Sequence, residues 1–189
     1  LPSFFYEKEL SLLFDSIDAS SFKGMRDLAL LELLYATGIR VSELTTIELK
    51  EIDLSYGILL VHGKGKKERY VPFGEYASQA LYQYIEKARP YLLRKKQHQR
   101  LFVNMRGDPL TDRGVRHILN EVVKKSALTH PIYPHKIRHS FATHLLNQGA
   151  DIRIVQELLG HENLSTTQVY THVTTDRLKQ IIDTAHPRA

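Results

Sequence analysis

Several basic side chains in this sequence could donate hydrogen bonds to an anion, and two of them have helical spacing. His135 and Arg138 are three residues apart, so a helix over this stretch places both on one face. Arg40 follows a very apolar segment that ends at Gly38, and His161 follows another predicted helix end. Guanidinium and imidazole groups donate hydrogen bonds to oxyanions, and the guanidinium stays protonated while doing so.

Each of these residues also has an ordinary structural explanation when it is taken alone. Arg40 can form an ion pair with Glu43, which lies three residues further on. His135 and His161 can cap helices or lie in the core. Tyr170, nine residues after His161, carries a hydroxyl that can act as a nucleophile, but a lone tyrosine is typical of packing.

A predicted hairpin carries further positive charge. Residues 57–61 and 68–72 have the composition of strands, and residues 62–67 between them are rich in turn formers. A single acidic residue, Glu68, is set against four basic ones at this tip: Lys64, Lys66, Lys67 and Arg69. A slim basic ribbon can enter a nucleic-acid groove and contact phosphates, whereas the alternative is a solvated tip that keeps the hairpin soluble.

Residue types and motif spacings exclude several other kinds of site. The 189 residues include no cysteine, which excludes disulfides, zinc–thiolate sites, iron–sulfur clusters and thiol nucleophiles. His135 and His139 have the spacing of a zincin pair, but Lys136 stands where that motif has glutamate, so we expect no metal. Residues 63–67 lack the spacing of a phosphate-binding loop, so we expect no nucleotide cofactor.

The balance of charge permits a nucleic-acid partner without requiring one. The 26 Lys and Arg residues exceed the 21 Asp and Glu residues by five, and the sequence pI is about 9.3. Hydrophobic residues make up 42% of the chain, which is typical of a globular domain. No apolar run approaches the ~20 residues that cross a bilayer, and the first residues do not have a secretory pattern. We therefore expect a cytoplasmic protein with no membrane partner.

The elements that must position these residues are mostly helical. The hydrophobic period predicts helices over residues 7–17, 23–37, 42–47, 75–88, 111–126, 135–147 and 151–159. A short helix from Ser165 then carries Tyr170, and a tail helix begins at Thr174 or Thr175. With residues 52–54 as a candidate third strand, the hairpin forms a small antiparallel sheet. The prediction is one mixed α+β domain over residues 1–189, predominantly α-helical.

In chain order, the singled-out residues are an Arg, a hairpin Lys, a His-x-x-Arg pair, a His and a Tyr. This ordered set resembles the catalytic domain of the tyrosine recombinases, the phage-integrase family. Residues 37–44 (TGIRVSEL) and 158–161 (LLGH) are especially similar to the Xer-type site-specific recombinases. The resemblance runs from about Phe5 to the C-terminus and covers all six catalytic positions, so it implies that family's catalytic-domain fold.

The resemblance implies a DNA strand transferase that needs neither a metal nor ATP. Tyr170 would attack a DNA phosphodiester to give a 3′-phosphotyrosyl link and a free 5′-hydroxyl. Arg40 and Arg138 would hold the non-bridging oxygens of that phosphate, and His161 would add a further donor. Such fixed donors suit the negative charge that the oxygens gain in the transition state.

Three further residues receive roles from the same resemblance. Lys64 would protonate the leaving 5′-oxygen, and His135 would assist proton transfer from the tyrosine. Glu43 would be a supporting acidic residue that does not itself contact the DNA. The remaining basic residues of the hairpin are expected to contact DNA: Lys66, Lys67 and Arg69.

The resemblance also implies partners. Recombinases of this family carry an N-terminal core-binding domain, and this chain, which starts at Leu1 without Met, is expected to be the catalytic half of a longer protein. A tetramer would act at a specific recombination site in double-stranded DNA, on the nucleoid. The tail helix, residues 174–186, has one apolar stripe, which either packs on its own domain or docks on a neighbouring protomer: Leu178, Ile181, Ile182 and Ala185.

Resolution of chromosome dimers is the function expected from the Xer-like stretches. A phage or transposon integrase of the same family remains an alternative, because target choice depends partly on the N-terminal half. A type IB topoisomerase shares the Arg, Lys, Arg, His and Tyr chemistry but relaxes supercoils. A DNA-binding module without catalysis is the alternative from a different class.

Overall fold

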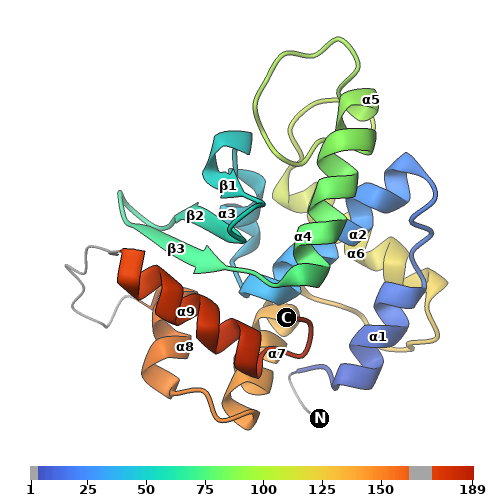
Figure 1. Ribbon diagram of the computed structural model, residues 1–189. Coiled ribbons are helices and arrows are strands. Elements are labelled where there is room, and N and C mark those ends of the chain that lie inside the picture. The colour runs from blue at the N-terminus through green and yellow to red at the C-terminus, as the bar shows by residue number, and fades with distance from the viewer. Residues whose placement is uncertain (1–3, 162–171) are drawn as a thin grey trace.

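The helix α2 (Phe22–Thr37) is apolar on nearly every side, and α1, α4, α5 and α7 pack around it. Figure 1 shows the arrangement in a computed structural model, which describes residues 4–161 and 172–189. Ser21 begins α2 by accepting a hydrogen bond from the Gly24 N–H at 2.9 Å. Gly38 ends it in the left-handed conformation, with φ 65°, as the sequence predicts.

Helices make up most of the described residues, which confirms the predicted fold class. The bounds of those around α2 are α1 (Glu7–Asp15), α4 (Glu75–Gln83), α5 (Arg89–Leu93) and α7 (Pro134–Asn147), and α6 (Asp112–Lys125) follows α5 in the chain. Two short helices and the tail helix complete the set: α3 (Val41–Thr45), α8 (Ile152–Leu159) and α9 (His172–Ala185). The helix predicted around Tyr170 lies outside the described residues.

The small sheet is antiparallel and has the strand order β1-β2-β3. Its strands are β1 (Ile52–Asp53), β2 (Ile58–His62) and β3 (Glu68–Pro72), and a 3-10 turn, η1 (Leu49–Glu51), precedes β1. Val61 pairs with Arg69 and Leu59 with Val71. All four of these residues are buried, so one face of the hairpin belongs to the core.

Several predicted boundaries differ from those in the structure, and the largest difference follows α4. The helix predicted to end at Ala88 continues through a π-helical turn, η2 (Tyr84–Ala88), into α5 and ends at Leu93. Pro90 has no N–H and clashes with a regular helical turn, and a wider turn before it relieves that clash. The short helix predicted over residues 42–47 instead spans Val41–Thr45, with Arg40 in the cap position.

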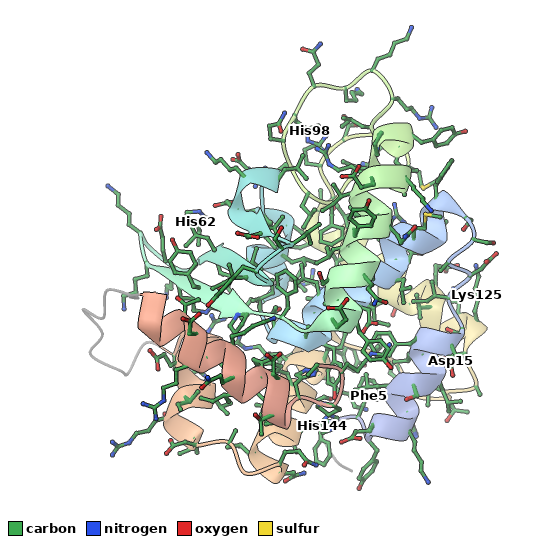
Figure 2. All side chains as sticks on the ribbon, in the orientation of Figure 1. Phe5, Asp15, His62, His98, Lys125 and His144 are labelled. Carbon is green, nitrogen blue, oxygen red and sulfur yellow. The ribbon has the colours of Figure 1, made fainter. Side chains whose placement is uncertain are left out.

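The N-terminal segment is fixed to α7 by its backbone. The Phe5 N–H donates to Ser140 Oγ at 2.8 Å, and His144 Nε2 donates to the Phe5 carbonyl at 2.7 Å (Figure 2). Because Nε2 carries the proton, His144 Nδ1 accepts from the Tyr35 hydroxyl at 2.6 Å. These contacts hold α7, which carries two of the predicted site residues, against α2.

The tail helix α9 packs on its own domain, against β3 and α7 (Figure 1). Three residues of its predicted apolar stripe are buried, Leu178, Ile182 and Ala185. Lys179 Nζ donates to the Phe73 carbonyl at 2.6 Å. Of the two arrangements that the sequence leaves open, this structure therefore has the intramolecular one.

Arg188, after the end of α9, also holds the tail against the domain. Arg188 donates to both carboxylate oxygens of Glu32, at 2.7 and 2.8 Å, and its guanidinium lies 4.1 Å from the ring centres of Phe14 and Tyr76. Burial raises the pKa of Glu32, and Arg188 opposes that rise. Arg188 therefore offsets part of the cost of burying this carboxyl group beside α2.

No helix within residues 4–161 and 172–189 is long and apolar enough to cross a membrane.

We expect Gly38→Ala to destabilise the protein more than Gly149→Ala. Both glycines have positive φ, 65° and 91°, which costs a non-glycine residue about 1 kcal/mol or more. A Cβ on Gly38 would lie 2.4 Å from the Phe141 ring, whereas a Cβ on Gly149 meets nothing within 4 Å. Overpacking should therefore add about 1–3 kcal/mol at Gly38. Urea unfolding measures both variants, and equal losses would show that the Phe141 ring yields without cost.

Candidate functional site

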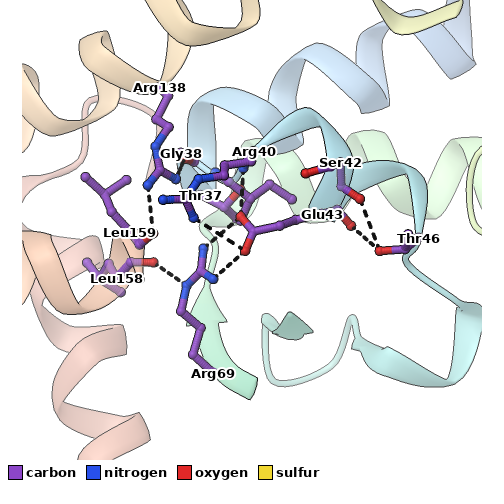
Figure 3. Close-up of polar contacts among 11 residues, drawn as sticks. Thr37, Gly38, Arg40, Ser42, Glu43, Thr46, Arg69, Arg138, Leu158 and Leu159 are labelled. Carbon is purple, nitrogen blue, oxygen red and sulfur yellow. Dashed lines mark hydrogen bonds and ion pairs between the residues drawn. The ribbon is translucent and has the colours of Figure 1, made fainter. Parts of the chain in front are cut away.

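Arg138 lies one turn into α7 and is buried against two backbone carbonyls. Its Nη1 donates to the Gly38 carbonyl at 2.7 Å, and its Nη2 donates to the Leu159 carbonyl at 2.8 Å (Figure 3). These carbonyls come from the C-terminal ends of α2 and α8, where the helix dipole is negative. The guanidinium has five N–H donors, and within the described residues two of them are used, which leaves three for a bound group.

Arg40 stands at the N-terminus of α3, and Glu43 fixes its backbone. The Arg40 N–H donates to Glu43 Oε1 at 2.8 Å. Arg40 Nη1 is 3.9 Å from Glu43 Oε2, and the arginine side chain is 45% exposed. The ion pair that the sequence allows is therefore long and weak, and the Arg40 guanidinium faces solvent.

Arg69 does not lie with the exposed hairpin lysines. Its side chain is 7% exposed, and Nη1 and Nη2 donate to the two oxygens of Glu43 at 2.6 and 3.1 Å. Its Nε donates to the Leu158 carbonyl at 2.8 Å. This placement contradicts the predicted DNA contact, because β3 turns the side chain inward and the protein itself uses three of its donors.

The other hairpin residues lie where the sequence predicts. Lys64, Lys66 and Lys67 are exposed on the turn between β2 and β3. The turn begins close to the arginine cluster, since a Cβ on Gly63 would lie 3.5 Å from Glu43 Oε2 and 3.6 Å from Arg69 Nη1. The turn lysines thus extend from the side of the site that Glu43 and Arg69 occupy.

The two predicted histidines lie on the elements that meet at Arg138. His135 is exposed in the first turn of α7, three residues before Arg138. His161 is exposed directly after Gly160, which ends α8 in the left-handed conformation with φ 72°. Tyr170, the predicted nucleophile, lies outside the described residues.

The local electrostatics favour an anion. Burial, followed by the charge of Arg40, lowers the pKa of Arg138 to about 10, so this guanidinium is protonated at neutral pH. Burial and then Arg138, Arg40 and Arg69 lower the pKa of His161, so its imidazole is neutral at pH 7 and donates through one N–H. A bound oxyanion would relieve this mutual repulsion of positive charge, which makes the site suited to a phosphate.

Two features of the site escape prediction from the sequence. The backbone carbonyls of Gly38 and Leu159, which orient Arg138, have no signature in residue types. The inward position of Arg69 has a weak signal, because Arg69 and Val71 are two residues apart and share a face of the strand. Among the described residues, no three of His, Cys, Asp and Glu are grouped so that they can hold a metal ion.

Known relatives share both sequence and fold with this chain. It is 56% identical over 189 residues to tyrosine recombinase XerC of Staphylococcus epidermidis and 57% identical over 191 residues to tyrosine recombinase XerC of Bacillus subtilis. Both matches take in the whole of this chain, which spans 63% of the length of these relatives.

Solved structures agree with this comparison. The crystal structure of XerA recombinase matches all of this chain and 67% of its own, with a TM-score of 0.78 and 32% identity. That of XerH site-specific recombinase bound to difH substrate in a pre-cleavage complex matches 97% of this chain and 50% of its own, with a TM-score of 0.73 and 25% identity. The model of the phage integrase family matches residues 3–177, and the chain therefore belongs to that family.

Proposed function

We propose that the protein is a site-specific DNA recombinase of the Xer type, which cuts and rejoins strands through a phosphotyrosine. The observation that carries the proposal is the grouping of Arg40, Arg138 and His161, three donors for one oxyanion, around the ends of α2 and α8. The relatives named tyrosine recombinase XerC and the structure of XerH on its difH substrate support an activity on DNA.

The first step is a transesterification. The Tyr170 oxygen attacks the phosphorus, its proton passes to a base assisted by His135, and the bond from phosphorus to the 5′-oxygen breaks. Lys64 gives a proton to that oxygen, because a 5′-alkoxide is a poor leaving group. Arg40, Arg138 and His161 stabilise the charge on the non-bridging oxygens.

The second step reverses the first with a different strand. A 5′-hydroxyl attacks the 3′-phosphotyrosine, tyrosine leaves, and the phosphodiester is restored. The number of phosphoester bonds is unchanged, so the cycle needs no energy source such as ATP. This property suits the exchange of strands at a specific site, and for an Xer-type enzyme the proposed outcome is resolution of chromosome dimers on the nucleoid in the cytoplasm.

Assembly is proposed to move the tail between protomers. In this structure α9 and Arg188 dock on their own domain, with Arg188 paired to Glu32. The same contacts, made on a neighbouring protomer of a tetramer on DNA, would couple the active sites. Both partners in these contacts belong to the same kind of chain, so an exchanged tail could pair its Arg188 with Glu32 of the neighbouring protomer.

We expect a covalent adduct with DNA that depends on Tyr170. The protein at its natural full length is incubated with a pool of nicked duplexes randomised around the nick, and adducts are recovered in SDS. Cleavage close to the nick frees a short fragment that carries the 5′-hydroxyl, and loss of this fragment prevents resealing and traps the phosphotyrosine. Tyr170→Phe should bind the selected duplex and form no adduct. Binding by both proteins with no adduct from either would identify a DNA-binding module.

We expect Lys64→Ala to impair cleavage of the DNA and Lys67→Ala to impair binding. Loss of the general acid should slow adduct formation at saturating protein about 10²-fold or more, with little change in Kd for the selected duplex. Lys67→Ala should weaken binding and reduce its salt dependence, because one phosphate contact is lost. Equal losses of binding alone in the two variants would exclude the leaving-group role of Lys64.

A charge exchange tests where the tail docks. Glu32→Arg and Arg188→Glu should each reduce recombination between two copies of the selected duplex at least tenfold, because like charges then meet in a buried contact. An equimolar mixture of the two variants pairs opposite charges only when each tail docks on the other protein. Recovery in the mixture supports exchange, whereas recovery only in the double variant supports intramolecular docking.

A further inference from the structure

Arg69 connects three segments that each carry a site residue. It lies on β3, beyond the turn that holds Lys64, and its guanidinium bridges Glu43 of α3 and the Leu158 carbonyl of α8. Glu43 in turn accepts from the Arg40 N–H. The path runs from the hairpin through Arg69 to the start of α3 and to the end of α8 (Figure 3).

The end of α8 is held by two guanidiniums side by side. Arg69 takes the Leu158 carbonyl and Arg138 takes the next one, that of Leu159. Gly160 comes next, and a Cβ there would lie 2.7 Å from Arg69 Nη1, so this glycine is needed for the guanidinium as well as for its φ of 72°. His161 is the residue after it, and its position depends on this fixed helix end.

The chemistry of Arg69 is that of a buried partner and not of a surface ligand. A buried charge is costly unless it is paired, and here the bidentate contact with Glu43 pairs it. Burial acts to raise the pKa of Glu43, but the hydrogen bonds and charge of Arg69, with help from Arg40, outweigh it and hold that pKa below its usual value. Glu43 is thus a carboxylate among the guanidiniums of Arg40, Arg69 and Arg138.

We propose that Arg69 is a positioning residue for the reaction, which holds Glu43 ionised and fixes Arg40 and the His161 end of α8 relative to the hairpin of Lys64. This inference rests on the proposed function. It assigns Arg69 no contact with DNA. Loss of Arg69 should therefore slow the reaction of bound substrate and leave the affinity for DNA nearly unchanged.

Arg89 provides a matched control. It is as buried as Arg69, 6% exposed in each case, and it also donates to backbone carbonyls, those of His98 and Arg100. Its hydrogen bonds within the described part of the chain involve no residue of the site. Arg69→Met and Arg89→Met therefore both remove a buried guanidinium, and only the first should affect the reaction specifically.

The first measurement needs no DNA. Titration of the Glu43 carboxyl by carbon NMR, in the protein at natural full length, should give a higher pKa in Arg69→Met and an unchanged one in Arg89→Met. The charged groups that face Glu43 are Arg40, Arg69 and Arg138, with His161 nearby. Burial raises the Glu43 pKa and Arg69 lowers it, so replacement of Arg69 should raise this pKa. An unchanged Glu43 pKa in Arg69→Met would overturn the proposal.

The second measurement is adduct formation with the selected nicked duplex. At saturating protein, Arg69→Met should react about 10–100-fold more slowly, the size of effect seen when supporting partners of a site are removed. The rate should fall further as the pH drops through the raised Glu43 pKa, and Glu43→Gln in the same protein should abolish that fall. Arg69→Lys keeps the positive charge but cannot contact both Glu43 and the Leu158 carbonyl. This variant should therefore recover only part of the rate, while the Glu43 pKa should return most of the way to its native value.

Three outcomes would contradict the role. Weaker binding of DNA with an unchanged rate would make Arg69 a DNA contact, and equal rate losses in Arg69→Met and Arg89→Met would make it merely structural. A full rate in Arg69→Lys would show that the bridge is not needed. If the native protein forms no adduct, the proposed function fails, and the Glu43 titration alone then decides whether Arg69 holds that carboxylate.

Discussion

The site depends on holding like charges together before any substrate is present. Arg40, Arg69 and Arg138 lie near enough to act on one another and on His161, and two of the three guanidiniums are buried. Such a cluster repels itself, and burial removes the water that would screen it. Negative groups must therefore be built in among them. The structure supplies one full charge, the Glu43 carboxylate, and several partial ones, the carbonyls at two helix ends.

The helix ends explain much of the surrounding architecture. Both α2 and α8 end at a glycine in the left-handed conformation, Gly38 and Gly160. Each helix therefore stops abruptly with its negative end at the cluster, where the carbonyls of Gly38, Leu158 and Leu159 accept from arginines. The apolar packing of α2 places one end, and the contacts of α7 with Phe5 and Ser140 help to place the arginine that bridges both. The packing of several helices thus brings together the arginines and the carbonyls of the helix ends, which come from different elements.

Features that arise from local chemistry can be predicted from the sequence, whereas features that depend on distant partners cannot. Glycine at a helix end and Thr111 or Asp151 at a helix start act through their own backbone, so those boundaries can be predicted. The gathering of Arg40, Arg138 and His161 is expected only from family resemblance, since their distance along the chain says nothing of contact. The sequence predicts Arg69 as a surface residue because it follows a turn rich in lysine, whereas its place on β3 opposite Val61 directs its side chain inward.

The segments on either side of Tyr170 are anchored to different parts of the domain. Before it, α8 ends in carbonyls held by Arg69 and Arg138, so the approach to the tyrosine starts from the site itself. After it, α9 is fixed by Lys179 to the Phe73 carbonyl and by Arg188 to Glu32. The first anchor belongs to the arginine cluster and the second to the tail. The proposed change of tail partner would therefore alter the anchor that follows Tyr170 and leave Arg69 and Arg138 in place, which would separate control of the proposed nucleophile from preorganisation of the site.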